Sequence, residues 1–262
     1  ATLPPVESED EWIWLLHDDS APEDDALEKL LEAAVDRPNI AMVGPKILGW
    51  NDRKHLLEVG ISIARNGARW TGLEDHEYDQ GQHDGIFEVL SVSTAGALIR
   101  RSVFEELGGF DEKLDLFRDD VDFGWRIHSA GQSVIVNTDA IVYHAEAAAS
   151  ERREVDVDEA FLHRPHLLDR RNAAYVLLTN STWWMLPLIT LQLIGAAVVR
   201  AIGYLFAKLP GYASDELLAL IRLFTRPDLV RAGRKWRKED RLVSPRIVTR
   251  FMPSRSVQLR SA

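Results

Sequence analysis

Near its N-terminus the chain contains Trp12-Ile13-Trp14-Leu15-Leu16-His17-Asp18-Asp19, an apolar run that ends in a histidine and two adjacent carboxylates. Five consecutive apolar residues predict a buried strand. Carboxylate oxygens are the ligands that hard divalent cations such as Mg²⁺ and Mn²⁺ prefer, and strand ends are where α/β proteins bind ligands. The stretch therefore predicts either a cation site at a strand end or a solvated acidic turn that binds nothing.

The residues that follow predict a helix. Ser20 and Glu23 have the spacing of a capping box, with Pro22 between them, so we expect a helix over residues 24–35. Further along, β-rich segments alternate with helical ones. Strands are expected at 39–45, 59–63, 87–92, 95–99, 133–136 and 140–143, helices at 103–107 and 119–130, and a long loop at 66–85. This alternation indicates an α/β fold with a sheet flanked by helices.

The composition is typical of a globular protein: of 262 residues, 46% are hydrophobic and 27% are charged. The chain has no cysteine, which excludes a disulfide scaffold and a thiolate metal site. Residues 1–150 have 12 Lys/Arg and 30 Asp/Glu, whereas residues 208–262 have 13 and 5. The acidic part argues against a nucleic-acid partner, which needs a basic face. The basic part suits anionic lipid headgroups.

A second group of carboxylates begins the helix expected at 119–130. Asp119 and Asp122 are neighbours on a helix, whereas Asp120 points about 100° away from Asp119. Because a helix N-terminus favours ionised carboxylates, the group indicates either a base that is ready at neutral pH or an acidic turn that only complements the helix dipole. His144 ends the strand expected at 140–143, and it is either a metal ligand or an ordinary hydrogen-bonded histidine.

The C-terminal part of the chain differs in character. A connector expected at 151–182 leads to a hydrophobic segment at 183–207, in which the 24 residues from Trp183 to Phe206 contain one charge, Arg200. A membrane span needs about 20 apolar residues, but an interfacial or buried helix also fits. A single span would place the basic amphipathic tail at 208–262 outside, against the positive-inside tendency. An interfacial or re-entrant segment avoids this conflict, as would further spans beyond Ala262. Residues 231–241 are expected to contact lipid headgroups.

Together these signals resemble the family 2 inverting glycosyltransferases, which have the GT-A fold. The resemblance covers roughly residues 10 to 145, and in detail it is to long bacterial members, particularly actinobacterial ones, in which membrane segments follow the catalytic domain. It rests on five segments, namely Trp14 to Pro22, Ser93 to Arg101, Leu107 to Asp111, Phe117 to Arg126, and Tyr143-His144. It implies a partial GT-A domain over residues 1–150, with a mixed sheet flanked by helices, followed by a helical, membrane-associated C-terminal region.

The resemblance also implies a role for each matching residue. Asp19 and His144 are expected to hold Mn²⁺ or Mg²⁺, and Asp120 is expected to be the catalytic base. His17 stands where the family signature usually has its first Asp, so the metal is expected to have fewer carboxylate ligands. The expected donor-binding residues are Asp18, Thr94, Ala95 and Gly96, and the expected acceptor-binding or supporting residues are Asp119, Trp125 and Arg126.

The implied activity is metal-dependent, inverting transfer of a sugar from a nucleotide-diphosphate sugar to a hydroxyl of a cell-envelope glycan or lipid-linked acceptor. The resemblance places this activity on the cytoplasmic face of the cell membrane, in contact with membrane lipids. The family's first strands, which bind the nucleobase, have no counterpart in the chain, and the chain does not begin with Met. It is therefore expected to be a fragment that is inactive alone.

Two other classes of protein also fit parts of the pattern. A metal-dependent phosphohydrolase also needs a strand that ends in carboxylates, but the haloacid-dehalogenase type requires Asp-x-Asp followed by Thr, and His17 to Ser20 does not supply that spacing. A non-catalytic, membrane-associated scaffold would keep a degenerate site that binds a nucleotide sugar or nothing. The presence of Asp19, Asp120 and His144 together argues against the scaffold.

Overall fold

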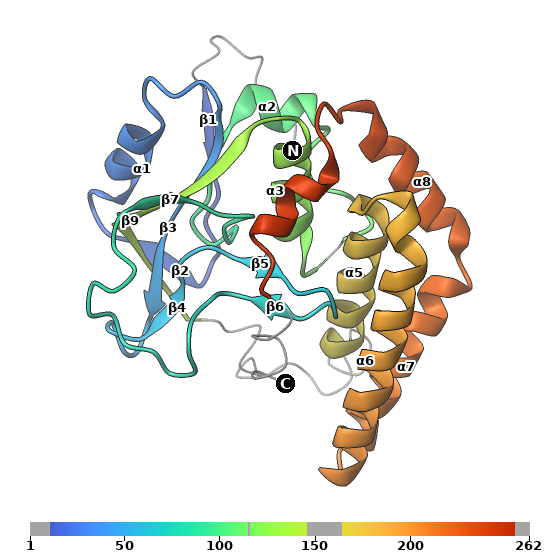
Figure 1. The fold of residues 1–262 in the computed structure, drawn as a ribbon. Helices are drawn as coiled ribbons and strands as arrows, with labels where there is room; N and C mark the ends of the chain where they lie inside the picture. The colour runs from blue at the N-terminus through green and yellow to red at the C-terminus, as the bar shows by residue number, and fades with distance from the viewer. Residues whose placement is uncertain (1–10, 115, 146–163, 255–262) are drawn as a thin grey trace.

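Figure 1 shows the fold in a computed structural model, which describes residues 11–114, 116–145 and 164–254. Its centre is a mixed sheet of seven strands. The main path runs β1 (Trp12–Trp14), β8 (Leu98–Arg100), β3 (Ile40–Gly49), β9 (Ser133–His144) and β2 (Ser20–Pro22); in addition β4 (Leu56–Glu58) pairs with β3, and β7 (Ile86–Glu88) pairs with β9. The predicted mixed sheet flanked by helices is thus confirmed.

The two long central strands, β3 and β9, are the only parallel neighbours in this sheet among the described residues. Every residue of β3 is buried, as expected for a strand covered on both faces. The prediction that Gly44-Pro45 ends the strand is wrong. Because proline has no N–H to donate, the register shifts at Pro45/Lys46, and pairing resumes up to Gly49 opposite His144. The segments predicted as strands at 133–136 and 140–143 form one strand, β9, which pairs with β3 on both sides of this register shift.

The predicted capping box is also wrong. Ser20–Pro22 form β2, which pairs antiparallel with the end of β9, and helix α1 (Ala26–Ala34) begins only after Asp25, without a side-chain cap. The Ser20 hydroxyl instead donates to the His17 carbonyl, and the Glu23 carboxylate accepts a hydrogen bond from Tyr143. Strand pairing outweighs the local helix signal here, so the two carboxylates lie between two strands.

The other elements of this part are short. Helix α2 (Arg101–Glu106) and helix α3 (Asp119–Ser129) occupy the predicted places. A separate hairpin consists of β5 (Ser62–Ile63) and β6 (Arg69–Trp70), so the loop expected at 66–85 contains one short strand. The strands expected at 59–63, 87–92 and 95–99 are present only in part, because much of each segment is irregular.

Four helices follow, α5 (Pro165–Asn180), α6 (Leu186–Phe206), α7 (Pro210–Phe224) and α8 (Pro227–Glu239), with short 3₁₀ turns at Trp183–Met185 and Pro245–Arg250. Figure 1 shows them on one side of the sheet domain. One hydrophobic core joins them to it, since Ile63, Leu90 and Trp125 pack with Leu177 and Leu193. The charged residues 151–158, expected to be part of the connector, lie outside the described residues, and the predicted division at 150, 182 and 207 stays a prediction.

One stretch among the described residues, Trp183–Phe206, is long and apolar enough to cross a membrane, with a mean hydropathy of 1.9. Helix α6 packs inward along one face, through Ile189, Leu193, Ala197 and Ala201. Arg200 forms a bidentate ion pair with the buried Glu216 of α7, with both N–O distances 2.9 Å. The remaining face of α6 is exposed and apolar.

Candidate functional site

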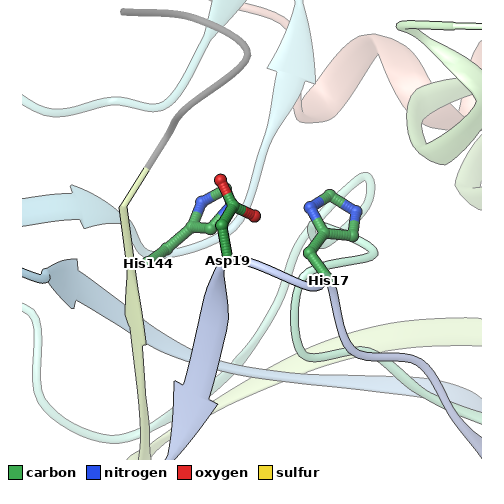
Figure 2. A group of neighbouring side chains, drawn as sticks. All are labelled: His17, Asp19 and His144. Carbon is green, nitrogen blue, oxygen red and sulfur yellow. The ribbon is translucent and has the colours of Figure 1, made fainter. Parts of the chain in front are cut away.

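The predicted strand-end corner brings three metal-ligating side chains together. Asp19 precedes β2 and His144 ends β9, and antiparallel pairing sets Ser20 opposite His144. As a result, His144 Nε2 lies 3.1 Å from Asp19 Oδ1. Figure 2 shows Asp19 between His144 and His17. One ligand atom from each of the three residues lies within 4.8 Å of the others.

His17 is the member of this group that sequence analysis did not count as a ligand. Its Nε2 lies 2.9 Å from Thr94 Oγ1, and its ring meets the His144 ring edge to face, with centroids 5.3 Å apart. Loss of water around the ring and the neighbouring His144 lower the pKa of His17, although Asp19, Asp120 and Asp18 act in the opposite direction. The neutral imidazole that results is the form that binds metals. The detectable signal was a histidine adjoining two carboxylates at a strand end.

The residue set fits a divalent cation. Two imidazole nitrogens and a carboxylate oxygen are all common ligands for such ions, and pairing between β2 and β9 fixes two of the three. No second group of three or more such residues with this spacing occurs in the described chain. His17, Asp19 and His144 are therefore the residues that could hold a metal here.

Helix α3 places Asp120 close to this group. The Asp120 carboxylate accepts the Val121 N–H at 2.6 Å, and its Oδ2 lies 3.8 Å from the guanidinium of Arg69 on β6. The Ser91 hydroxyl donates to the Asp120 carbonyl at 2.6 Å. Asp120 also contributes to the electrostatic environment of the His17 ring, so the predicted base and the three candidate ligands share one site.

A close approach of two backbones fixes the position of α3. A Cβ atom at Gly124 would lie 2.3 Å from the Leu90 carbonyl oxygen and 2.6 Å from the Ser91 Cβ. Only glycine allows the helix to pass so near this segment. The same segment supplies the Ser91 hydroxyl to Asp120, so the glycine helps to hold the first turn of α3 at the site.

Asp119 differs electrostatically from a surface carboxylate. Burial, and then the negative charge of Asp120 beside it, raise the pKa of Asp119 to about 7 from an ordinary value of 3.8. Two adjacent carboxylates in poor contact with water resist double ionisation. Asp119 is therefore largely protonated below neutral pH, in contrast to the freely ionised turn that the sequence suggested.

The raised pKa of Asp119 predicts a pH effect on stability. The folded state keeps the Asp119 proton at pH values where the unfolded chain has lost it, so this group lowers the free energy of unfolding as pH rises from about 4 to about 7. We expect Asp119→Asn to remove that part of the pH dependence. Urea unfolding of both proteins at pH 5 and pH 8 checks this: the variant should gain stability relative to wild type at pH 8. Equal pH slopes for the two proteins would contradict the assignment.

The predicted supporting residues of α3 face the interior. Trp125 is 2% exposed and belongs to the core shared with α5 and α6. Arg126 pairs with Asp122 at 2.9 Å and donates to the carbonyls of Leu107 and Gly109. Both side chains thus hold α3 against the interior of the protein.

The segment 94–96, predicted to bind the donor, lies beside the histidine of the corner. Thr94 contacts His17 as described, and Ala95 is fully buried. The Gly96 carbonyl accepts a hydrogen bond from the Trp14 indole at 3.3 Å. Asp18 is exposed at the turn between β1 and β2. Within the segment 94–96, Thr94 is therefore the residue whose side chain contacts the candidate metal group.

One arginine of the basic helix α8 is buried in the protein, although the sequence predicted contact with the membrane surface. Residues 231–241 were expected to contact lipid headgroups, but Arg237 points into the protein and pairs with Asp111 and Asp122, both at 2.7 Å. That part of the expectation is wrong, because two buried carboxylates need a counter-charge. Nothing in the sequence linked Arg237 to residues more than a hundred positions away.

Comparisons with known proteins point to one family. Residues 1–156, more than half of the chain, match the family model described as "Glycosyltransferase like family 2". The chain is 30% identical over 144 residues, 51% of its length, to the O-antigen biosynthesis protein RfbC of Myxococcus xanthus. It is 33% identical over 93 residues, 35% of its length, to N-acetylglucosaminyl-diphospho-decaprenol L-rhamnosyltransferase of Mycobacterium tuberculosis. It spans only 10% and 27% of the length of these relatives.

Among solved structures, one that is similar is described as GalNAc-T7 with UDP, GalNAc and Mn²⁺. The TM-score is 0.44 at 12% identity, over 64% of this chain and 31% of that one. This likeness is too distant to bear on the substrate or the metal of the present chain.

Proposed function

The chain belongs to glycosyltransferase family 2, and from this premise we propose that it transfers a sugar from a nucleotide-diphosphate sugar to a hydroxyl of an envelope glycan or lipid-linked acceptor. One observation supports this above all: His17, Asp19 and His144 offer ligand atoms within 4.8 Å of one another, and the charge of Asp120 acts on the His17 ring. A base and a cation site side by side are what displacement at a sugar carbon with a diphosphate leaving group requires.

On the donor side, His17, Asp19 and His144 would hold Mn²⁺ or Mg²⁺. The bound ion would neutralise charge on the departing diphosphate. The Thr94 hydroxyl, 2.9 Å from His17 Nε2, would orient that ring for binding through its other nitrogen. Asp18, exposed on the same turn, would contact the sugar or ribose.

On the acceptor side, Asp120 would take the proton of the attacking hydroxyl. Asp120 is in the first turn of α3, and its Oδ2 lies 3.8 Å from the Arg69 guanidinium. Asp119 beside it has a pKa raised to about 7 by burial and by the charge of Asp120. A single displacement from the face opposite the leaving diphosphate would invert the anomeric configuration.

Metal-dependent donor binding tests the role of the cation site. We expect Asp19→Ala to weaken Mn²⁺-dependent binding of the nucleotide-sugar donor by about tenfold to a hundredfold, as loss of a ligand or its support does. Calorimetric titration of the complete gene product, with Mn²⁺ and with EDTA, measures this. Asp24→Ala, an exposed carboxylate at the start of α1, is the matched control and should bind as wild type does. Equal donor affinity in wild type with and without metal would refute the role.

We further propose that the protein rests on the cytoplasmic face of the cell membrane through α6 and α7. The outer face of α6 exposes large apolar side chains, and α7 adds more beside it: Leu188, Leu191, Ile194, Val198, Val199, Ile202, Leu205, Phe206, Leu217, Ile221 and Phe224. Trp183 is 76% exposed at one end of α6, and Lys208 is exposed at the other. Aromatic and basic side chains at the ends of an apolar face suit the headgroup boundary. The inward ion pair of Arg200 favours a helix that lies on the membrane over one that spans it.

Vesicle binding tests this orientation. Leu191 and Val199 are 68% and 70% exposed, so glutamate at both positions should leave the fold intact. We expect Leu191→Glu with Val199→Glu to lower partitioning onto phosphatidylglycerol-containing vesicles by about tenfold or more in a sedimentation assay. Leu242→Glu, at a 79% exposed leucine outside these helices, is the control. Unchanged binding by the double variant would contradict the proposal.

A further inference from the structure

A small cleft that is open to solvent lies between the sheet domain and the C-terminal helices. It is bordered by the β5–β6 turn, α3, the end of α5, the start of α6 and the last 3₁₀ turn. Its main lining residues are Arg65, Trp125, Thr182, Met185, Ile189 and Arg246. None of these residues belongs to the candidate metal group, so the cleft is a separate feature.

Several polar groups that line the cleft lack partners among the described residues. The Trp125 indole N–H and the Thr182 hydroxyl are buried and make no hydrogen bond within the described residues. Arg65 is half-buried, and its guanidinium has no ion pair or hydrogen bond with any residue that the structure describes. Arg246 stacks on Trp184 at 4.2 Å, also without a carboxylate from the described chain. Buried donors without partners are costly, and two guanidinium groups beside them indicate an anionic ligand rich in oxygen.

The opposite walls of the cleft are apolar. Leu177, Met185, Ile189 and Met252 line it, and Ile189 is on the inward face of α6. The outer face of the same helix is the exposed apolar surface proposed above to touch the membrane. The apolar lining could contact the hydrocarbon of an amphiphile whose charge lies against Arg65 and Arg246.

The cleft also adjoins the predicted base. Trp125 is five residues beyond Asp120 on α3, little more than one turn. Arg65 is in the turn of the hairpin whose second strand has Arg69, 3.8 Å from Asp120 Oδ2. The cleft and Asp120 are thus on neighbouring parts of α3, and Arg65 and Arg69 belong to one hairpin.

We propose that this cleft binds the phosphate and the adjoining hydrocarbon of a lipid-linked acceptor, with Arg65 and Arg246 on the phosphate and the apolar wall on the chain. The role as an acceptor site rests on the proposed sugar transfer, whereas binding of a lipid phosphate does not. The proposed site contacts both the phosphate and the hydrocarbon. A prenyl alcohol without the phosphate, or a free anion without the hydrocarbon, should therefore bind more weakly.

Binding of farnesyl phosphate, a short prenyl phosphate that is water-soluble, tests the proposal. Calorimetry with the complete gene product, without donor or metal, makes the result independent of whether sugar is transferred. We expect Arg65→Met to raise the Kd by about tenfold or more, as loss of a charge-assisted hydrogen bond does. We expect Thr249→Trp, at an exposed residue that lines the cleft, to obstruct it and raise the Kd similarly without a change of charge.

Matched controls separate the cleft from general effects. Arg37→Met removes an exposed arginine that is not among the residues lining the cleft. Thr225→Trp enlarges an exposed threonine whose hydroxyl donates to carbonyls of preceding residues, as the Thr249 hydroxyl does. Both should bind farnesyl phosphate as wild type does. Farnesol and inorganic phosphate should each bind wild type at least about tenfold more weakly.

Three results would overturn the proposal. The first is wild-type affinity for farnesyl phosphate in both Arg65→Met and Thr249→Trp. The second is equal affinity of wild type for inorganic phosphate and farnesyl phosphate, which would indicate a free anion. The third is absence of binding in wild type, which would indicate that another segment or partner fills the cleft. Absence of sugar transfer with these binding results intact would count against the proposed function and not against the lipid-phosphate site.

Discussion

We expect Asp120→Asn to lower the turnover number for sugar transfer by about a hundredfold to ten-thousandfold, the usual contribution of a general base. The amide keeps the shape of the side chain and still accepts the Val121 N–H seen at 2.6 Å. It cannot take a proton from the acceptor hydroxyl. Since the candidate metal ligands are other residues, donor affinity should change little. Steady-state kinetics together with donor titration separate these two effects.

Asp139→Asn is the control for this prediction. Asp139 is an exposed residue in the irregular part of β9, and its conversion to the amide should leave turnover as in wild type. Near-normal turnover in Asp120→Asn would remove Asp120 from the role of base. An equal loss of donor affinity and turnover would instead assign it to donor binding.

The second large effect concerns the anchor of helix α8. Arg237 is 1% exposed, and its guanidinium lies 2.7 Å from both Asp111, 2% exposed, and Asp122, which is fully buried. Asn180 donates to the same Asp122 oxygen at 2.7 Å, and the Tyr175 hydroxyl donates to Asp111 at 2.8 Å. One arginine therefore connects three helices and the loop that precedes α3.

Replacing Arg237 with methionine should destabilise the protein by about 3–5 kcal/mol, the cost of removing one partner from buried ion pairs. Methionine has similar bulk, so loss of packing contributes little. Urea unfolding followed by circular dichroism measures the change. Arg231→Met, at an exposed position on the same helix, should change stability by less than about 0.5 kcal/mol. A loss below about 1 kcal/mol in Arg237→Met would show that the buried pair contributes little.

The location of the candidate metal group was predictable, whereas its third candidate ligand, His17, was not. A strand that ends in two carboxylates and a distant histidine after a second strand indicated Asp19 and His144. Their contact depends on β2 pairing with the end of β9, and the local signal for that segment was a helix start. His17 was missed because its role depends on Thr94 and His144, which are remote in sequence.

Helix α3 shows the same division between local and remote information. Its start and end follow from an acidic first turn and a glycine after the last turn, and both were predicted closely. The pKa of Asp119 depends on burial by other segments, and the partner of Asp122 comes from α8. These follow from tertiary packing, which the pattern of one helix does not contain.

The amphipathic character of the C-terminal helices was also visible, but the direction of individual side chains was not. A run of 24 apolar residues fits a span, a buried helix or an interfacial helix equally well. The proposal of an interfacial helix rests on two features that only the structure shows, the inward ion pair between Arg200 and Glu216 and the burial of one face of α6.

Release of nucleoside diphosphate tests the central claim most directly. The complete gene product would be incubated with a panel of uridine, guanosine and thymidine diphosphate sugars, in membranes that supply candidate acceptors, with Mn²⁺ or with EDTA. We predict release from at least one donor that requires the metal and is lost in Asp120→Asn. No release from any donor, or release that is the same in EDTA, would contradict a metal-dependent sugar transfer at this site.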